Sequence, residues 1–422
     1  VTTGKANEVV SPEFKAAGHK VIVLKPEYDE NGLPETESLL AIFAKVTELF
    51  RSGKAVAGYT PGIGGIAEAV MKMCFGNSIG FKFADDVTVE ELFGYSYGSF
   101  VLEVTEDVEG RILGETTEEK TLVLGEEKLC LCEMLDIYEG KLESVFACNI
   151  PNSNSPMENF NYSVNEWKAP AIKVAKPKVL IPAFPGTNCE FDSAKAVADA
   201  GAEPEIMVIN NLSAEGIHRS IEAFAEKIKE SQMIFIPGGF SGGDEPDGSA
   251  KFITAFFRNG LIKEGVTDLL DNREGLMCGI CNGFQALIKL GLVPYGKIID
   301  TDENCPTLTF NTIDRHQSRI VHTRIASNKS PWLSLTNVGD VYNVPISHGE
   351  GRFIASASLI RRMANNGQIA TQYVDLSGHP TMDIRFNPNS SIDAIEGITS
   401  PDGRVLGKMG HSERIGNEVC KN

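Results

Sequence analysis

A sharp turn from strand to helix is encoded by the stretch Gly279-Ile280-Cys281-Asn282-Gly283-Phe284-Gln285. The apolar run before it predicts a buried strand, and the helical pattern after it ends near Gly291. Glycines on both sides of the cysteine permit a nucleophile elbow, in which the nucleophile projects from the turn at a helix N-terminus. The free N–H groups and dipole of such a helix lower the pKa of a thiol and can stabilise an oxyanion. The stretch therefore predicts Cys281 as the nucleophile of an enzyme.

Strand and helix patterns alternate regularly around this elbow. The predicted strands are apolar throughout and span residues 179–184, 205–209, 233–236 and 276–280. The predicted helices are amphipathic and span residues 190–200 and 213–229. Apolar strands separated by amphipathic helices are typical of a parallel sheet covered on both faces, which binds ligands at the carboxyl ends of its strands. We therefore predict an α/β fold with a doubly wound, mostly parallel sheet.

Three glycine-marked loops follow three of these strands, so we expect them to meet at one edge of the sheet. They are the elbow, Pro185-Gly186-Thr187-Asn188-Cys189-Glu190 and Pro237-Gly238-Gly239-Phe240-Ser241-Gly242-Gly243-Asp244. Cys278 falls within a predicted strand and is interpreted as core. Cys189 follows the helix cap Asn188, so we expect it in a first turn without special exposure or a direct role.

A cysteine nucleophile needs a general base, and the base needs a group that orients it. Two segments offer a histidine followed two residues later by a glutamate, His348-Gly349-Glu350 and His411-Ser412-Glu413. On an extended segment such residues point to the same side, so either carboxylate could reach its imidazole. Spacing alone does not choose between the two pairs. The remaining candidates lack such a partner and are interpreted as surface or structural residues: His316, His322 and His379.

The chain of 422 residues is long enough for two or three domains. Residues 1–150 mix strand and helix patterns and predict a smaller α+β lobe, in which a glycine-rich turn at 60–65 opens a helix. Residues 151–177 are rich in Pro, Asn and Ser without a sustained period, which predicts a linker. Residues 178–422 form the predicted main domain.

Composition limits the classes of partner. A formal charge of -18 and a pI near 4.9 argue against nucleic-acid binding, and no run of about 18 apolar residues could span a membrane. The nine cysteines are scattered, which favours a reducing compartment and a cytoplasmic protein. Cys130 and Cys132 are expected on one face of a strand, and no second pair at zinc-ligand spacing accompanies them, so no metal site is expected.

The motifs taken together resemble the triad-type glutamine amidotransferase domain of phosphoribosylformylglycinamidine synthases, an enzyme family of purine synthesis. The resemblance covers about residues 180–414. It rests on the elbow, on the two other glycine-marked loops, and on Ser347-His348-Gly349-Glu350-Gly351-Arg352 and His411-Ser412-Glu413-Arg414. It implies a flavodoxin-like fold of the class I glutamine amidotransferases.

The resemblance also implies roles for the site residues. The family's C-terminal His-Pro-Glu-Arg supplies base and orienting acid, which maps to His411 and Glu413, with Ser412 where proline is usual. The family's His-Gly-Glu-Gly loop lines the glutamine site. The expected oxyanion-hole residues are Gly239 and Asn282, and the expected substrate-binding residues are Gly238, Phe240, Gln285, His348, Gly349 and Glu350.

Residues 1–150 resemble, less strongly, the C-terminal lobe of the second repeated half of the synthetase. We therefore expect the chain to be the C-terminal part of a whole synthase, with glutamine and the remaining synthetase domains as its partners. No cofactor is expected in the glutaminase domain, and ATP and Mg²⁺ are expected only in the full synthase. The glycine turn at 60–65 could in principle bind an anion at the helix N-terminus.

Two other interpretations remain open. A cysteine hydrolase of the same sheet architecture, such as a peptidase or deglycase, would keep the elbow and place its acid and base elsewhere. A non-catalytic docking module would keep the fold and leave the cysteine idle.

Overall fold

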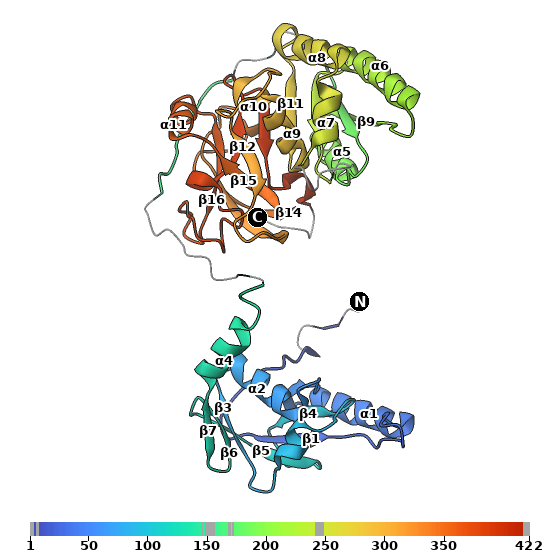
Figure 1. Cartoon of the computed structure of the whole chain (residues 1–422), viewed down its shortest axis with the longest axis vertical. Coiled ribbons are helices and arrows are strands. Elements are labelled where there is room, and N and C mark those ends of the chain that lie inside the picture. The colour runs from blue at the N-terminus through green and yellow to red at the C-terminus, as the bar shows by residue number, and fades with distance from the viewer. Residues whose placement is uncertain are drawn as a thin grey trace. The chain divides into compact units, whose positions relative to one another are not determined.

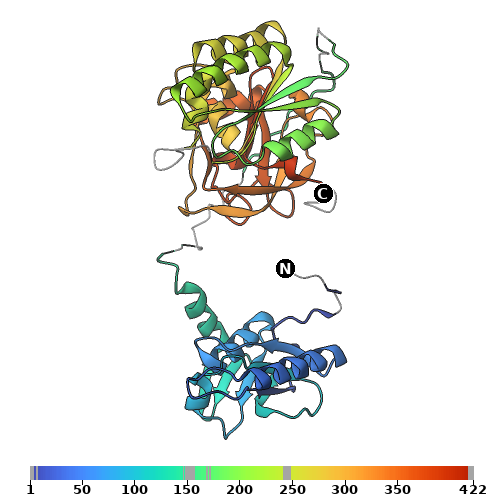
Figure 2. The same ribbon diagram turned by 90° about the vertical axis from the view of Figure 1, so that its right-hand side faces the viewer.

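The computed structural model describes residues 4–5, 8–145, 147, 157–167, 170, 173–240 and 249–416. The chain divides into two compact units, Val1–Ala147 and Cys148–Asn422, and each is considered by itself (Figures 1 and 2). In these described ranges no helix has the length and apolar character needed to cross a membrane.

The first unit is a seven-stranded sheet in the order β2-β4-β1-β5-β3-β6-β7. Its strands are β1 (Lys20–Leu24), β2 (Ala55–Tyr59), β3 (Gly80–Phe83), β4 (Phe100–Val104), β5 (Arg111–Thr117), β6 (Thr121–Leu124) and β7 (Glu127–Cys130). Its helices are α1 (Thr36–Ser52), α2 (Gly65–Asn77), α3 (Val89–Phe93) and α4 (Leu131–Gly140). Side chains alternate across β1, as a pleated strand requires. Val21 and Val23 pack in one core with α2, while Ile22 and Leu24 pack in another with α1.

The glycine-rich turn at 60–65 opens α2 as predicted, but a carboxylate of the protein already occupies it. Oε2 of Glu68 accepts a hydrogen bond from the Gly64 N–H at 2.9 Å, and Oε1 lies 2.6 Å from the Lys72 ammonium. A Cβ built on Gly64 would lie 2.7 Å from Cβ of Glu68, so the turn has closed around this side chain. The structure therefore gives no support to an anion site at this helix N-terminus.

The prediction that Cys130 and Cys132 share one face of a strand is wrong. Cys130 ends β7, and Cys132 lies in the first turn of α4. Helical spacing decides the conformation here, because Leu131 is buried and Met134, three residues later, packs against the same core. The structure joins the two cysteines as a disulfide, which the sequence did not indicate.

The second unit is built on a nine-stranded sheet in the order β14-β13-β16-β17-β18-β11-β10-β8-β9. Strands β9, β8, β10, β11 and β18 are parallel, and the pairing is antiparallel from β18 through β17, β16 and β13 to β14. The strands are β8 (Lys178–Ala183), β9 (Glu203–Val208), β10 (Met233–Ile236), β11 (Leu276–Ile280), β13 (Gln317–Ile325), β14 (Val341–His348), β16 (Ile369–Val374), β17 (Ile395–Thr399) and β18 (Val405–Lys408). Two further strands, β12 (Thr307–Phe310) and β15 (Glu350–Ile354), form a separate antiparallel pair. The predicted α/β class is confirmed, and the sheet continues into an antiparallel half that was not predicted.

Helices lie on both sides of this sheet (Figure 2). They are α5 (Glu190–Asp199), α6 (Ala214–Glu230), α7 (Lys251–Phe257), α8 (Gly260–Thr267), α9 (Asn282–Leu290), α10 (Leu292–Tyr295) and α11 (Ala357–Asn365). Shorter helical turns span Asp268–Asn272, Pro331–Leu333, Ile392–Ala394 and Ser412–Arg414. The loops after β8, β10 and β11 leave the sheet at its carboxyl edge. Thr187 of the first loop and Gly239 of the second form a β-bridge, so these loops meet as expected.

Part of the predicted linker packs against the second unit. The side chain of Phe160 is buried in that unit's core, and its N–H donates to Oε1 of Gln372 at 3.1 Å. The Tyr162 N–H donates to the carbonyl of Ala326 at 2.9 Å, and Arg324 donates to the carbonyl of Phe160 at 2.9 Å. Residues 157–167 therefore form a strap, which individual hydrogen bonds and the buried Phe160 side chain attach to the second unit. Such a strap has no helix or strand period, which is why its sequence resembles a linker.

Candidate active site

Cys281 stands at the junction of β11 and α9 with an unusual backbone conformation. Its φ is 53° and its ψ is -107°, a region that non-glycine residues rarely adopt and that structures retain mainly at functional turns. Its N–H donates to the carbonyl of Lys408 on β18 at 2.9 Å, and its carbonyl accepts the first helical bond from Gln285 at 3.0 Å. The thiol is thus fixed at a helix N-terminus at the carboxyl edge of the sheet.

The two glycines of the elbow are required by close backbone approach. A Cβ on Gly279 would lie 2.6 Å from the carbonyl oxygen of Gly283. A Cβ on Gly283 would lie 2.1 Å from the carbonyl oxygen of Ile236 on the neighbouring strand. The small-x-Cys-x-small pattern is therefore the signature of helix α9 packed tightly onto β10 and β11.

The loop after β10 forms one wall of the site. A Cβ on Gly238 would lie 2.5 Å from Cε1 of His411 and 3.3 Å from both Sγ of Cys189 and Cβ of Cys281. Gly239 has a φ of 149°, and a Cβ there would lie 2.5 Å from the carbonyl oxygen of Gly186. Among the described residues none accepts a hydrogen bond from the Gly239 N–H. Residues 241–248 of the same predicted loop lie outside the described ranges.

His411 and Glu413 form a buried pair. Nδ1 of His411 lies 2.6 Å from Oε1 of Glu413, and each side chain is only 2% exposed. Burial alone would lower the pKa of His411, but hydrogen bonds with the thiols of Cys189 and Cys281 and with Glu413 outweigh it and raise the pKa to about 12. The extended geometry expected for this pair is wrong, because Ser412–Arg414 is a turn of 3-10 helix with His411 at its N-cap. That turn still brings the carboxylate to the ring.

His348 and Glu350 do not form such a pair. A sharp turn separates the two residues, since His348 ends β14 and Glu350 begins β15. Oε2 of Glu350 accepts instead from the Ser249 N–H at 3.0 Å. Both ring nitrogens of His348 lack a hydrogen-bond partner within the described part of the chain. Burial, with the nearby charges of His411 and His316, lowers the pKa of His348 to about 3, so this imidazole is neutral.

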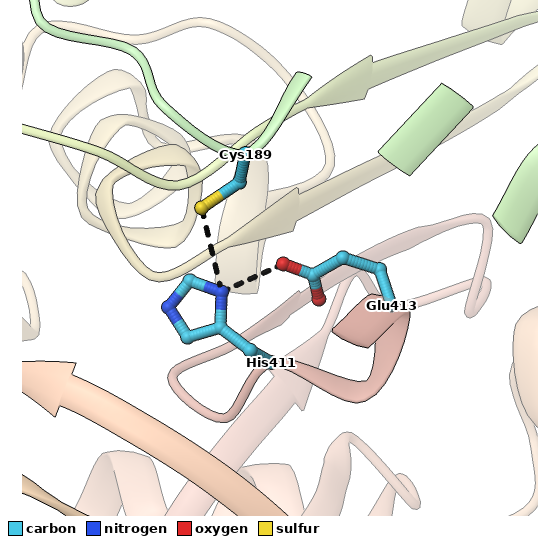
Figure 3. A group of neighbouring side chains, drawn as sticks. All are labelled: Cys189, His411 and Glu413. Atoms are coloured by element: carbon cyan, nitrogen blue, oxygen red, sulfur yellow. Dashed lines mark hydrogen bonds and ion pairs between the residues drawn. The ribbon is translucent and has the colours of Figure 1, made fainter. Parts of the chain in front are cut away.

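Cys189, for which the sequence indicated neither special exposure nor a direct role, is buried and lies beside the His411–Glu413 pair. Its Sγ lies 3.8 Å from Nδ1 of His411 and accepts a hydrogen bond from the Arg414 guanidinium at 2.9 Å. Figure 3 shows Cys189 and Glu413 on the same ring nitrogen of His411, with the other nitrogen facing away from both. The loop 185–190 thus brings a second thiol to the imidazole.

A cavity of about 200 Å³ opens onto Cys281. It is lined by most of the predicted substrate-side residues together with residues that the sequence did not single out. The lining residues are Gly239, Phe240, Ser249, Cys281, Gln285, Phe310, Asp314, Arg315, His316, His348, Gly349 and Glu350. Gln285 is held in place because its amide donates to the carbonyl of Glu350 and its oxygen accepts from Asn282 at 2.9 Å.

The second unit and this site fall within one known family. Residues 176–422, more than half of the chain, match the family described as CobB/CobQ-like glutamine amidotransferase domains. The chain belongs to this family.

Individual relatives of this glutamine amidotransferase carry more specific names. The phosphoribosylformylglycinamidine synthase subunit PurQ of Methanococcus maripaludis is 36% identical over 244 residues, which cover 58% of this chain and 84% of the relative. The subunit of the same name from Treponema denticola is 35% identical over 251 residues, covering 56% and 88%. Among solved structures, PurLQS from Thermotoga maritima is similar with 24% identity and a TM-score of 0.42, covering 58% of this chain and 92% of that one.

Sequence reasoning missed several residues of the amidotransferase site. His316 was interpreted as surface or structural. It is exposed, and it also lines the cavity, with its Nε2 3.0 Å from the Ser347 hydroxyl. It reaches the site because β13 pairs with β14 and places Gln317 opposite His348. That pairing brings His316 to the cavity that Cys281 also lines.

Cys189, His411 and Glu413 of the amidotransferase also have the residue types of a metal site, with ligand atoms within 4.8 Å of one another. Their contacts are those of hydrogen bonds. The 2.6 Å separation of Nδ1 from Oε1 leaves no room for an ion between them. The guanidinium of Arg414 at 2.9 Å from the sulfur places a positive charge where a cation would have to bind. The chemistry that fits the group is proton transfer.

Proposed function

We propose that residues 176–422 hydrolyse glutamine to glutamate and ammonia through a thioester on Cys281. One observation carries the proposal: the cysteine at the strained elbow and the buried His411–Glu413 pair meet at one edge of the sheet, beside a cavity that opens onto the cysteine. A nucleophile, a base and an acid that orients the base are the parts that acyl transfer requires.

His411 takes the proton of the Cys281 thiol, and the raised pKa of His411 keeps the resulting imidazolium beside the thiolate. Glu413 holds Nδ1, which leaves Nε2 as the nitrogen that takes the proton. The thiolate attacks the side-chain amide carbon of glutamine, and the N–H groups of Gly239 and Asn282 stabilise the oxyanion. The imidazolium returns its proton as ammonia leaves. Water, deprotonated by His411, then attacks the thioester, which releases glutamate and restores the thiol.

The part of the cavity lined by His348 and its neighbours fits the role of glutamine recognition. His348 is buried and neutral, and its ring nitrogens have no partner among the described residues, so it can exchange hydrogen bonds with a substrate without adding a charge. Gln285, Gly349 and Glu350 stand around it, and Gly238 and Phe240 come from the loop after β10. Glutamine would thus supply a hydrogen-bonding partner that the described residues do not provide.

The ammonia serves phosphoribosylformylglycinamidine synthase. Relatives at 35–36% identity carry the name of a subunit of that enzyme, which supports this assignment. In such a synthase ammonia passes to a synthetase site, where ATP and Mg²⁺ drive the amidination of formylglycinamide ribonucleotide. The remaining synthetase domains would be the partners of this chain, and the first unit would be a lobe of the synthetase. We place the protein in the cytoplasm.

The test is a glutaminase assay on the full chain and on a Cys281→Ala variant, with glutamate and ammonia measured together. We expect both products in equal amounts from the wild-type chain and neither from the variant. A peptide and a glycated-amine substrate run alongside cover the hydrolase alternative, and turnover of either in place of glutamine would overturn the proposal. Iodoacetamide labelling covers the docking alternative, which would be favoured if Cys281 reacted no faster than Cys74 or Cys278.

A further inference from the structure

A buried ion pair lies immediately next to the His411 segment. The ammonium of Lys408 on β18 is 3.7 Å from Oε1 of Glu396 on β17, and the two side chains are 7% and 0% exposed. Burying two charges is costly, and such a pair is often no more stable than well-packed apolar residues of the same volume. Neither residue lines the cavity at Cys281. The pair therefore calls for an explanation beyond stability.

The remaining hydrogen bonds of the pair go to the residues on both sides of His411. Oε1 of Glu396 accepts from the Gly410 N–H at 2.6 Å. The Lys408 ammonium donates to the Gly410 carbonyl at 3.3 Å and to the Ser412 hydroxyl at 2.8 Å. The second carboxylate oxygen of Glu396 accepts from the Thr371 hydroxyl. Every charge of the pair is thus satisfied, and the chain is fixed immediately before and after the imidazole.

Lys408 also contacts the nucleophile through its backbone. Its carbonyl accepts the hydrogen bond from the Cys281 N–H at 2.9 Å, while its side chain holds the segment that carries His411. Gly410 is closely packed and has no space for a side chain, because a Cβ there would lie 2.6 Å from Cγ1 of Val344 and 3.0 Å from Oε1 of Glu396. One residue therefore links the positions of nucleophile and base.

We propose that Lys408 and Glu396 are positioning residues that hold His411 in its place relative to Cys281. Ser412 takes part by accepting a hydrogen bond from the Lys408 ammonium. The proposal rests on the proposed glutaminase function. Ser412 stands where the resembling family usually has proline, and a proline could not accept the ammonium's hydrogen bond. In this chain the serine hydroxyl and the buried lysine act as a matched pair.

The experiment compares four variants of the full chain by steady-state glutaminase kinetics and by the rate at which 6-diazo-5-oxo-norleucine labels Cys281. Ser412→Ala removes the acceptor from an exposed position, and Ser412→Thr keeps the hydroxyl. Lys408→Met/Glu396→Gln removes both charges, so that neither remains unpaired in the interior. The fourth variant adds Ser412→Ala to that pair. Lys329→Met is the matched control, because it removes a partly buried ammonium that donates to the Asn366 carbonyl outside the site.

We expect Ser412→Ala to lower kcat about fivefold with KM within about twofold, Ser412→Thr to recover wild-type kcat, and the charge-free variant to lose about 30-fold or more. Adding Ser412→Ala to the charge-free variant should cost nothing further, because the two sites act through one contact. Additive losses, or wild-type kcat in the charge-free variant, would overturn the positioning role. If the wild-type chain does not hydrolyse glutamine, the proposed function fails, whereas the labelling rates still decide the positioning role in the same way.

Discussion

The thiol of Cys189 lies 3.8 Å from Nδ1 of His411, on the ring nitrogen that Glu413 already holds at 2.6 Å. A base that accepts a proton from a nucleophile through Nε2 therefore faces away from Cys189 (Figure 3). The Arg414 guanidinium also donates a hydrogen bond to the sulfur of Cys189 at 2.9 Å. Cys189 thus affects the charge distribution around His411, whereas of these two cysteines only Cys281 lines the cavity.

This relationship predicts different outcomes at the two cysteines. Cys281→Ala should abolish glutamine hydrolysis and labelling by 6-diazo-5-oxo-norleucine. Cys189→Ala should keep the labelling and lose less than about tenfold in kcat, because His411 retains Glu413 as its orienting partner. Mass spectrometry of the labelled peptides checks both. Label on the Cys281→Ala protein would show that another thiol is the nucleophile.

The two histidines should separate kinetically. His411→Ala should lower kcat by about 100 to 10000-fold, the usual contribution of a general base. His348→Ala should raise KM for glutamine with kcat within about threefold, since no carboxylate of the described residues bonds His348 to orient it as a base. Glu413→Gln should lie between the two in kcat. Loss of kcat at saturating glutamine in His348→Ala, with only a KM effect in His411→Ala, would reverse the roles.

The Gly238→Ala variant should lose glutaminase activity while its second unit remains folded. The new methyl group would lie 2.5 Å from Cε1 of His411, so the ring must shift. Displacements of about 1 Å at a reacting group can cost about 100-fold in rate, and we expect a loss of at least that size in kcat. Gly260→Ala is the control, because a Cβ there meets nothing within 4 Å. Equal kcat in the two variants, with equal circular dichroism, would contradict the close packing of Gly238 on the imidazole.

Acid should destabilise the second unit through His348. Its pKa of about 3 in the folded chain lies below the ordinary value of about 6.5, so only the unfolded chain binds a proton there between these limits. Stability is then lost as pH falls, at about 1.4 kcal/mol per pH unit. His411 adds nothing in this window, because its raised pKa leaves it protonated in both states. Between pH 7 and pH 4.5 the free energy of unfolding, measured with urea, should fall by about 2 to 3 kcal/mol less in His348→Asn than in the wild-type chain. Equal losses would mean that His348 titrates normally.

The strap at 157–167 should stabilise the second unit. The separate main domain predicted for residues 178–422 implies that a chain beginning at Lys176 folds alone. The packing of Phe160 predicts that a chain beginning at Met157 is more stable. Burial of the ring and the hydrogen bonds of Phe160 and Tyr162, less the cost of ordering the strap, should add about 2 to 4 kcal/mol to the free energy of unfolding. Urea midpoints of the two chains measure this. Phe160→Ala in the longer chain should remove at least half of the difference, and identical midpoints would show that the strap contributes nothing.

The sequence by itself determined those features that depend on neighbouring residues. Apolar runs at 233–236 and 276–280 became β10 and β11, and the helical pattern ending at Gly291 became α9. The elbow was readable because the glycines at 279 and 283 relieve contacts made within a few residues or with the adjacent strand. These patterns can be read from the sequence because steric contacts between nearby residues require them.

Tertiary structure alone decided the rest. The spacing of His348 to Glu350 equals that of His411 to Glu413, and only folding assigns the first carboxylate to the Ser249 N–H and the second to an imidazole. Cys189 reaches His411 although the two residues are 222 positions apart in the chain. His316 and the Lys408–Glu396 pair take their places through the pairing of β13 with β14 and of β17 with β18. A carboxylate binds whichever donor the fold presents, so its partner is fixed by non-local packing, which residue spacing does not record.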